Sequence, residues 1–340
     1  MMAHDGYMTG TQITSEVDFN VEGKQAGYLR VPHSVHRSAY GWAPVPVTVL
    51  RNGDGPTLVI TAGVHGDEYE GQIAVGNLAR DLDAKEIRGR LILLPMLNFP
   101  AAEAGSRVSP LDQGNLNRLY PGDARGGPSA MIAHYHEEVI LPLADYAVDL
   151  HSGGSSLIYP ATLLRGPAHS PDEEAGLAAM TKAFDLPYAW VFTGGGGKGS
   201  TAGTAMGAAN RKGVINVMAE LGGAGRVTPD ILRQTERGLR RILNALGMLP
   251  GYVPDAAGGT RLLTSKGLVY AYEAGIFEPL KTIGDDVAQG EPIAMIHHPD
   301  TPGKAPDELC SAYEGLVLAM RAMAQTRRGD ALFQIATEVV

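Results

Sequence analysis

Two short stretches of the sequence carry the residue types that bind a transition metal. His65 and Glu68 stand three residues apart in the segment Gly63–Glu68, and His151 follows Asp149 by two residues. An imidazole and a carboxylate at this loop spacing can turn toward one cation, and such nitrogen and oxygen ligands suit zinc. His65, Glu68 and His151 form a two-histidine, one-carboxylate set that leaves one coordination position open, as catalytic zinc sites do. Asp149 is a candidate to orient the imidazole of His151 by a hydrogen bond.

Each of these residues also has an ordinary structural interpretation. Asp67 or Glu68 could cap the helix that follows, and His65 could be a hydrogen-bonded polar side chain that binds no metal. Asp149 could be a polar residue at the end of its strand. The chain has a single cysteine, Cys310, which excludes an intrachain disulfide and a cysteine-based zinc site. Any metal must therefore be bound by His, Asp or Glu.

The candidate ligands follow predicted strands of an α/β fold. Apolar runs that predict strands lie at 28–31, 45–50, 57–62, 90–97, 146–150, 189–192 and 214–220. Helical spacing occurs at 69–82, 131–143, 177–184 and 229–246. This alternation predicts an α/β domain with a largely parallel sheet. Because such sheets bind ligands at the carboxyl ends of their strands, we expect His65 and His151 at one edge.

A different pattern begins after the Pro- and Gly-rich stretch 250–259. Short strand-like runs follow one another, and Ala271–Ile276 is echoed by Ala312–Val317. Each copy leads to a Gly-Asp step, at 284–285 and at 329–330. Two such halves resemble the barrel-sandwich hybrid of biotinyl and lipoyl domains. The Met-Lys-Met and Asp-Lys-Ala sequences of a carrier lysine are absent from the hairpin tips, so we expect no carrier role.

The composition is that of an ordinary folded protein, with 44% hydrophobic and 19% charged residues in 340. A net charge of −9 provides no global basic field for a polyanion, so we expect no nucleic acid partner. No stretch approaches the roughly 18 apolar residues of a membrane span, and residues 1–20 contain no apolar signal segment. We therefore expect no membrane association and a cytoplasmic location.

Four motifs in this order resemble the succinylglutamate desuccinylase/aspartoacylase family of the zinc-carboxypeptidase-like superfamily. They are Gly63–Gly71, Gly114–Gly122, Asp149–His151 and Ala219–Gly222, and the resemblance covers about residues 55–340. The sequences of the first two motifs are most similar to those of the branch that deacetylates Nα-acetyl-2,4-diaminobutyrate in ectoine catabolism. The resemblance implies a mixed sheet flanked by helices and a smaller, all-β C-terminal domain. We expect an N-terminal β extension (1–50), a catalytic domain (51–255) and the C-terminal β domain (256–340).

The resemblance assigns one Zn2+ per chain to His65, Glu68 and His151 and the general base to Glu220. The apolar run 214–219 supports this assignment, because it delivers Glu220 to the same sheet edge. A carboxylate beside the metal can accept a proton from water and later hand it to the leaving amine. The alternative is a solvated glutamate at the end of a strand.

The same resemblance places substrate contacts in the second motif. Asn117 and Arg118 match the family's carboxylate-binding pair, and a forked guanidinium suits planar recognition of a carboxylate. Arg107 matches the arginine that polarises the scissile carbonyl. Asn115 stands where aspartoacylase itself has an aspartate, and the spacing between Arg107 and Arg118 is longer than in that enzyme. A surface arginine is the alternative interpretation of Arg118.

Together these features predict a zinc-dependent hydrolase that cleaves the amide bond of a small N-acyl amino acid. The alternatives are a metallocarboxypeptidase that acts on peptides and a metal-binding homologue without turnover. The glycine run 193–201 departs from the phosphate-binding loop consensus, and we expect a mobile loop over the cleft or a plain linker there. A homo-oligomer is possible.

Overall fold

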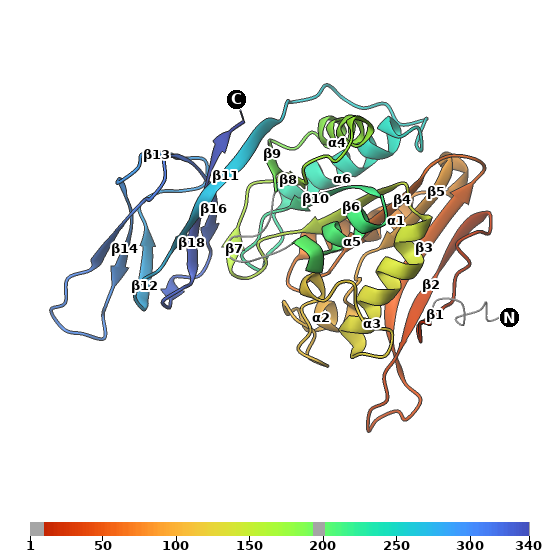
Figure 1. Ribbon diagram of the computed structural model, residues 1–340, viewed down its shortest axis with the longest axis horizontal. Coiled ribbons are helices and arrows are strands. Elements are labelled where there is room, and N and C mark those ends of the chain that lie inside the picture. The colour runs from red at the N-terminus through yellow and green to blue at the C-terminus, as the bar shows by residue number, and fades with distance from the viewer. Residues whose placement is uncertain (1–9, 193–200, 340) are drawn as a thin grey trace.

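One long mixed β-sheet runs through the computed structural model of the chain, which describes residues 10–192 and 201–339 (Figure 1). The glycine run predicted as a loop lies, apart from Thr201, outside these described residues. Within them the sheet has 14 strands in the spatial order β1-β2-β3-β5-β4-β6-β10-β8-β9-β11-β18-β16-β13, with β7 paired to β16. The strands are β1 (Thr14–Ser15), β2 (Gly23–Pro32), β3 (Trp42–Asn52), β4 (Thr57–Ala62), β5 (Gly89–Leu94), β6 (Tyr146–His151), β7 (Leu157–Ile158), β8 (Thr162–Arg165), β9 (Tyr188–Val191), β10 (Ile215–Glu220), β11 (Arg261–Tyr270), β13 (Asp286–Val287), β16 (Gly315–Arg321) and β18 (Ala331–Glu338).

The four central strands are parallel, as the alternation of apolar runs predicted. β4 pairs in parallel with β5 and β6, and β10 pairs in parallel with β6. Every residue of β4 is buried, which explains its uninterrupted apolar sequence. The prediction of a largely parallel sheet is wrong on either side of this centre, because β3 is antiparallel to β5 and β8 is antiparallel to β10, although β8 and β9 are again parallel. The sheet is therefore mixed, as the family resemblance implied.

Helices cover both faces of the central strands. The α-helices are α1 (Tyr69–Asp81), α2 (Phe99–Ala104), α3 (Pro128–Tyr135), α4 (Pro171–Phe184), α5 (Ala205–Arg211) and α6 (Pro229–Ala245). Apolar residues of α1, α4 and α6 share one buried cluster with one face of the sheet. Residues of α3 and α5 form a second cluster with the other face and the N-terminal strands. The central strands, whose carboxyl ends carry the candidate metal ligands, thus lie between two packed helical layers.

Several short elements were not predicted from the sequence. The strand β8 has four residues, and the helices α2 and α5 have six and seven, so each is too short for its apolar residues to repeat over several periods. The predicted helix 131–143 is divided into α3, one π-helical turn (His136–Ile140) and one 3-10 turn (Leu141–Leu143). Other 3-10 turns lie at Ala84–Glu86, Leu116–Arg118 and Thr201–Gly203.

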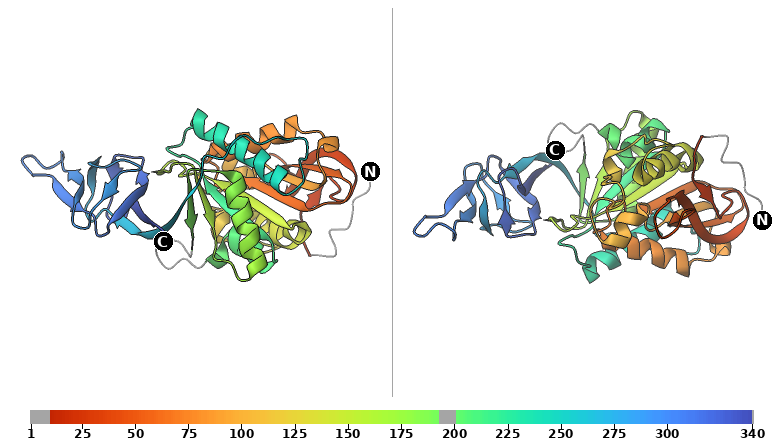
Figure 2. Two further views of the ribbon diagram at one scale, coloured as in Figure 1. Left: turned by 90° about the horizontal axis from the view of Figure 1, so that it is seen from above. Right: turned by 90° about the horizontal axis from the view of Figure 1, so that it is seen from below.

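The C-terminal part, from β11 to β18, is a β structure that projects from one end of the body, which the elements up to α6 form (Figure 2). A second sheet has the strand order β15-β14-β12-β17, made of β12 (Gly275–Pro279), β14 (Pro292–His297), β15 (Asp307–Cys310) and β17 (Gln325–Thr326). It packs on β11, β16 and β18 around a separate apolar core. The two copies of the repeat meet across hydrogen bonds, with the Gly290 amide donating to Ser311 and the Gly329 amide donating to Ala271. The predicted α/β fold with a smaller C-terminal β part is confirmed.

The body and the C-terminal part share the long sheet. β11 pairs in parallel with β9 of the body and antiparallel with β18 of the C-terminal part. Hydrogen-bonded strands therefore continue across the predicted boundary near residue 256, and the three-part division remains a prediction. Among the described residues, none of the helices has both the length and the apolar character that a membrane crossing requires.

Gly71 and Gly76 of α1 offer a matched test of how closely this helix packs on the sheet. A methyl group at Gly71 would lie 2.7 Å from Leu150 Cβ, whereas nothing lies within 4 Å of one at Gly76. We expect Gly71→Ala to destabilise the fold by about 1–3 kcal/mol through overpacking. Gly76→Ala should be neutral or stabilise it by up to about 1 kcal/mol through helix propensity. Urea unfolding of both variants measures the difference, and equal effects would show that α1 is not tightly seated.

Candidate active site

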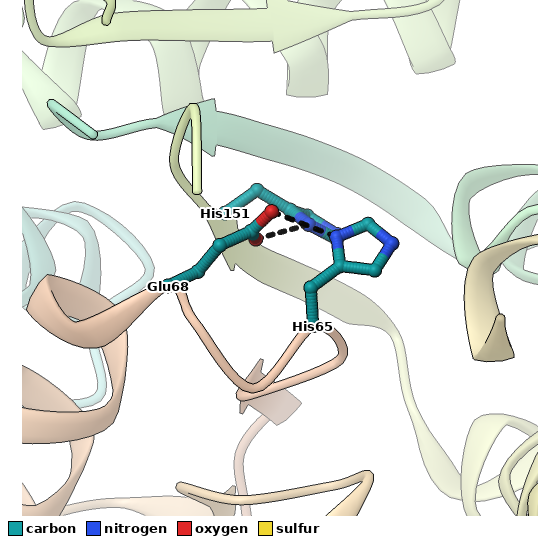
Figure 3. Close-up of side chains that lie close together, drawn as sticks. All are labelled: His65, Glu68 and His151. Carbon is teal, nitrogen blue, oxygen red and sulfur yellow. Dashed lines mark hydrogen bonds and ion pairs between the residues drawn. The ribbon is translucent and has the colours of Figure 1, made fainter. Parts of the chain in front are cut away.

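Three buried side chains converge at the carboxyl edge of the central strands. His65 and Glu68 lie in the loop after β4, and His151 is the last residue of β6. The Nδ1 atoms of His65 and His151 each lie 2.8 Å from a different carboxylate oxygen of Glu68 (Figure 3). One ligand atom from each residue lies within 4.8 Å of the others, and each residue is 3% exposed. The structure therefore brings together the three ligands predicted from the sequence.

A hydrogen bond to its other ring nitrogen orients each imidazole. His151 Nε2 donates to Asp149 Oδ2 at 2.9 Å, and Thr61 Oγ1 donates to Asp149 Oδ1 at 2.6 Å. His65 Nε2 donates to Asn115 Oδ1 at 3.1 Å. Because these partners hold a proton at Nε2 on both rings, Nδ1 is the nitrogen that each histidine can offer to a metal. Asn115 was not predicted to have this contact, although its pairing with Asn117 in Gly-Asn-Leu-Asn was a usable signal.

The electrostatics of this cluster favour a cation. Burial alone would raise the pKa of Glu68, but the imidazoles of His65 and His151 outweigh it and hold that pKa well below its usual range. Burial lowers the pKa of His151, yet Asp149 and Glu68 raise it far above its ordinary value. Two buried carboxylates thus draw positive charge into the cluster. Two free imidazole nitrogens and a carboxylate fit a zinc ion by donor type and by charge.

The other acidic side chains of the first motif fasten neighbouring loops. Asp67 accepts hydrogen bonds from the Ser155 amide at 2.7 Å and from its hydroxyl at 2.8 Å. Glu70 Oε1 accepts from the Thr228 amide at 3.1 Å. The first turn of α1 has no side-chain cap hydrogen bond from Glu68, so the capping interpretation is wrong. The motif instead joins the loops that follow β6 and β10 to the ligand loop.

Glu220 ends β10 directly beside His151, with which it is paired in the parallel register. Its Oε2 atom is buried and has no hydrogen-bond partner among the described residues. Burial, together with the charge of Glu68, raises the pKa of Glu220 to about 8. The carboxyl group can therefore take up a proton near neutral pH, which a general base must do.

A cavity of about 460 Å³ opens onto this cluster. Seven of the residues predicted from the sequence line it: His65, Glu68, Arg107, Asn117, Arg118, His151 and Glu220. Asp149 lies behind His151 and does not line it. Residues from distant parts of the sequence thus line one cavity of the size that takes a small molecule.

Both arginines line the cavity, and Arg107 also contacts a candidate metal ligand. Arg107 Nη1 lies 3.6 Å from Glu68 Oε1, and the side chain is 47% exposed. Arg118 Nη1 donates to the main-chain oxygen of Asn117 at 2.7 Å, and burial lowers its pKa, with help from the charge of Arg107. Asn117 Oδ1 accepts from the Ala205 amide at 2.9 Å, which leaves its amide group to donate. These three residues therefore present several donors to an anion in the cavity.

The C-terminal part supplies one wall of the same cavity. Its lining residues are Ser265, Gly267 and Leu268 of β11 and Ala331 and Gln334 of β18. The Tyr159 hydroxyl donates to Gln334 Oε1 at 3.2 Å and ties this wall to the body. Neither Tyr159 nor Gln334 was predicted as a site residue. Gln334 carried a signal, since it is a polar residue inside the apolar strand β18.

Three other histidines have partners outside the ligand cluster. His297 Nε2 lies 2.5 Å from Glu278 Oε2, and His298 Nε2 lies 2.6 Å from Asp307 Oδ2. His136 bonds to Tyr120. Within residues 10–192 and 201–339, His65, Glu68 and His151 are the one group of three that could hold a metal ion.

Comparison with known proteins agrees with the geometry. The sequence model of the succinylglutamate desuccinylase/aspartoacylase catalytic domain matches residues 54–246. The N-alpha-acetyl-L-2,4-diaminobutyric acid deacetylase of Halomonas elongata is 37% identical, over 100% of this chain and 99% of its own length. A succinylglutamate desuccinylase/aspartoacylase structure from Rhodobacter sphaeroides superposes with a TM-score of 0.90 at 36% identity, over 97% of this chain and 100% of that one. The product-bound ectoine utilization protein EutE (DoeB) of Ruegeria pomeroyi gives a TM-score of 0.90 at 34% identity, over 96% and 98%.

The raised pKa of Glu220 predicts how the stability of the metal-free protein depends on pH. The unfolded chain releases this proton near pH 4.5 and the folded chain near pH 8, so ionisation opposes folding as the pH rises through that window. Glu220→Gln removes the effect. The difference in free energy of unfolding between Glu220→Gln and the wild type should shift in favour of the variant by about 1 kcal/mol per pH unit between pH 4.5 and 8. Above pH 8 this difference should stay constant. Urea unfolding across this range measures it, and a difference independent of pH would contradict the assignment.

Proposed function

Because the chain belongs to the succinylglutamate desuccinylase/aspartoacylase family, we propose that it is a zinc-dependent deacetylase of Nα-acetyl-2,4-diaminobutyrate or a close analogue. The family acts on the amide bonds of N-acyl amino acids, so the chain is a hydrolase of carbon–nitrogen bonds other than peptide bonds. One observation carries the proposal. A single cavity is lined by the candidate metal ligands, a carboxylate with a raised pKa and the Asn117–Arg118 pair.

His65, Glu68 and His151 would hold one zinc ion per chain. When bound, zinc supplies a Lewis acid that polarises the amide carbonyl and lowers the pKa of a water molecule. The protein's part is to keep the two imidazoles in the required tautomer, which the hydrogen bonds to Asp149 and Asn115 do.

Glu220 is the proposed proton carrier. Its position beside His151 at the end of β10 puts the carboxylate next to the ligand cluster. It accepts the proton of the attacking water and passes it to the nitrogen of the leaving amine. A buried carboxyl group with a raised pKa holds the proton between these two events, since water does not remove it at once.

Arg107, Asn117 and Arg118 are the proposed substrate contacts. The guanidinium of Arg118 and the free amide of Asn117 bind the α-carboxylate, which places the acyl group at the metal end. Arg107, close to Glu68 and half exposed, faces the position where negative charge develops on the carbonyl oxygen.

The lining of the cavity supports a small substrate without a second carboxylate. Among the described lining residues, the charged side chains belong to the ligand cluster, Glu220 and the two arginines. The remaining wall is neutral and includes Trp190, Phe192 and Gln334. An amino group of a diaminobutyrate side chain can bind to aromatic faces and neutral oxygen atoms, whereas a side-chain carboxylate finds no cation there. The wall from β11 and β18 also limits length, which argues against a peptide substrate.

The setting of the reaction is part of the proposal. The lone cysteine, Cys310, is free and exposed, which favours a reducing compartment and hence the cytoplasm. Assembly into a homo-oligomer remains a prediction.

The variant Glu220→Gln tests the proposed chemistry. It keeps the shape of the side chain but cannot accept a proton, so release of 2,4-diaminobutyrate from its Nα-acetyl derivative should fall by about 10²- to 10⁴-fold. Zinc content, measured by elemental analysis, should remain one per chain. The exposed Glu103→Gln on α2 is the matched control and should be fully active.

Three outcomes would contradict the proposal. Full activity of Glu220→Gln with zinc retained would remove Glu220 from the mechanism. A wild type that releases amines from no N-acyl amino acid but trims peptides from the carboxyl end would be a carboxypeptidase. A wild type that binds zinc without either activity would be a non-catalytic homologue.

Arg118→Leu tests the carboxylate contact. The loss of a charge-assisted hydrogen bond should raise KM for Nα-acetyl-2,4-diaminobutyrate by about 10- to 100-fold. The corresponding α-carboxamide should be hydrolysed equally by variant and wild type, because it has no carboxylate for the guanidinium to bind. The exposed Arg125→Leu serves as control. An equal loss with both substrates would mean that Arg118 acts elsewhere.

A further inference from the structure

A second, much smaller cavity lies between the central strands and α5. Its volume is about 10 Å³, close to the space that one water molecule occupies by this measure. Its polar lining consists of Thr61, His136, Asp149 and Asn216, and apolar side chains complete it. The lining is mostly apolar, but its four polar side chains give one buried water molecule the hydrogen-bond partners that it needs.

His136, which lines this cavity, has an unsatisfied nitrogen. The residue is 3% exposed and begins the π-helical turn His136–Ile140, a distortion that occurs frequently at functional sites. Its Nδ1 atom lies 2.8 Å from the Tyr120 hydroxyl. Its Nε2 atom is buried and has no hydrogen-bond partner among the described residues. Buried polar atoms are almost always paired in native proteins, so this nitrogen requires a partner.

The protonation of the two residues gives the hydrogen bonds a direction. Burial raises the pKa of Tyr120 well above its ordinary value, so its hydroxyl keeps the proton and donates to His136 Nδ1. Burial also lowers the pKa of His136 to about 4, so the ring is neutral. A neutral imidazole that accepts at Nδ1 carries its proton at Nε2. The N–H group of His136 is therefore at Nε2, the nitrogen that lacks a partner.

Asp149, which lines the same cavity, can accept a further hydrogen bond. It already accepts one from Thr61 and one from His151, and an ionised carboxylate has about four acceptor positions. We propose that one water molecule in this cavity accepts from His136 Nε2 and donates to Asp149, so that His136 and Tyr120 are positioning residues for the ligand His151. This inference rests on the metal site of the proposed function.

The same contacts join the ligand to the substrate-binding segment. Tyr120 lies two residues after Arg118, and its amide donates to the Gly203 carbonyl just before α5. The π-helical turn also holds α5, because Glu137 forms a bidentate ion pair with Arg211 at 2.8 and 2.7 Å. Tyr120, His136, the water and Asp149 thus connect the Asn117–Arg118 segment to His151. A shift in either site would be transmitted through fixed hydrogen bonds.

The variant His136→Phe tests the proposal with zinc itself as the probe. It fills the ring volume but removes both nitrogens, so the apparent dissociation constant for Zn2+, measured by chelator competition, should rise about 10-fold. His136→Gln keeps a donor and an acceptor and should stay within about threefold of the wild type. His134→Phe, two residues earlier on α3 and outside the cavity lining, is the matched control and should bind zinc normally. If His136→Phe fails to fold, Tyr120→Phe provides a second test. It removes one hydroxyl group and should also weaken zinc binding.

A crystal structure of the wild type at high resolution gives a direct reading. A water within hydrogen-bond distance of His136 Nε2 and Asp149 supports the proposal, and apolar contact at Nε2 with no water overturns it. Unchanged zinc affinity in folded His136→Phe and Tyr120→Phe also overturns it. These readings require no turnover. The wild type could bind zinc without deacetylase activity while His136→Phe and Tyr120→Phe bind zinc more weakly. That result would contradict the proposed function and leave this inference standing.

Discussion

The carboxylate of Glu68 lies between two imidazoles in a region that water barely reaches, and the geometry of the site depends on this contact. A buried carboxylate is costly unless positive charge or donors surround it. Strands β4 and β6 bring His65 and His151 to its two oxygens at 2.8 Å. The neighbouring residues serve this arrangement: Asp149 and Asn115 orient the imidazoles, and Asp67 and Glu70 bind the adjoining loops.

The sequence was sufficient for the residues that follow buried strands. Apolar runs end immediately before the segments that contain His65, His151 and Glu220, and parallel strands bring such ends to one edge of a sheet. Tyr159 and Gln334 were missed because their meeting depends on the pairing of β11 with β9, which joins segments about 70 residues apart. No local periodicity encodes that pairing. The sequence assigned no role to His136, and only its burial beside Asp149 and Tyr120 shows what it contacts.

The lining of the cavity consists of a charged group and a neutral group of residues. The charged group is the ligand cluster, Glu220 and the two arginines, whereas β9, β11 and β18 contribute neutral side chains. Fixed charges at the reacting end cost no reorganisation when charge develops there, because they are already oriented. A neutral far wall leaves the selection of the side chain to shape and to weak polar contacts, which discriminate by size more than by charge.

The strand β11 belongs to the body and to the C-terminal part at once, since it pairs with β9 on one side and β18 on the other. A wall attached through two ladders of main-chain hydrogen bonds cannot swing outward as a hinged domain does without breaking one of them. The width of the cavity is therefore a property of the sheet itself. Substitutions on the inward face of β11 or β18 can alter which substrates fit while the ligand-bearing strands β4 and β6 stay untouched. Chemistry and selectivity can thus change independently of each other.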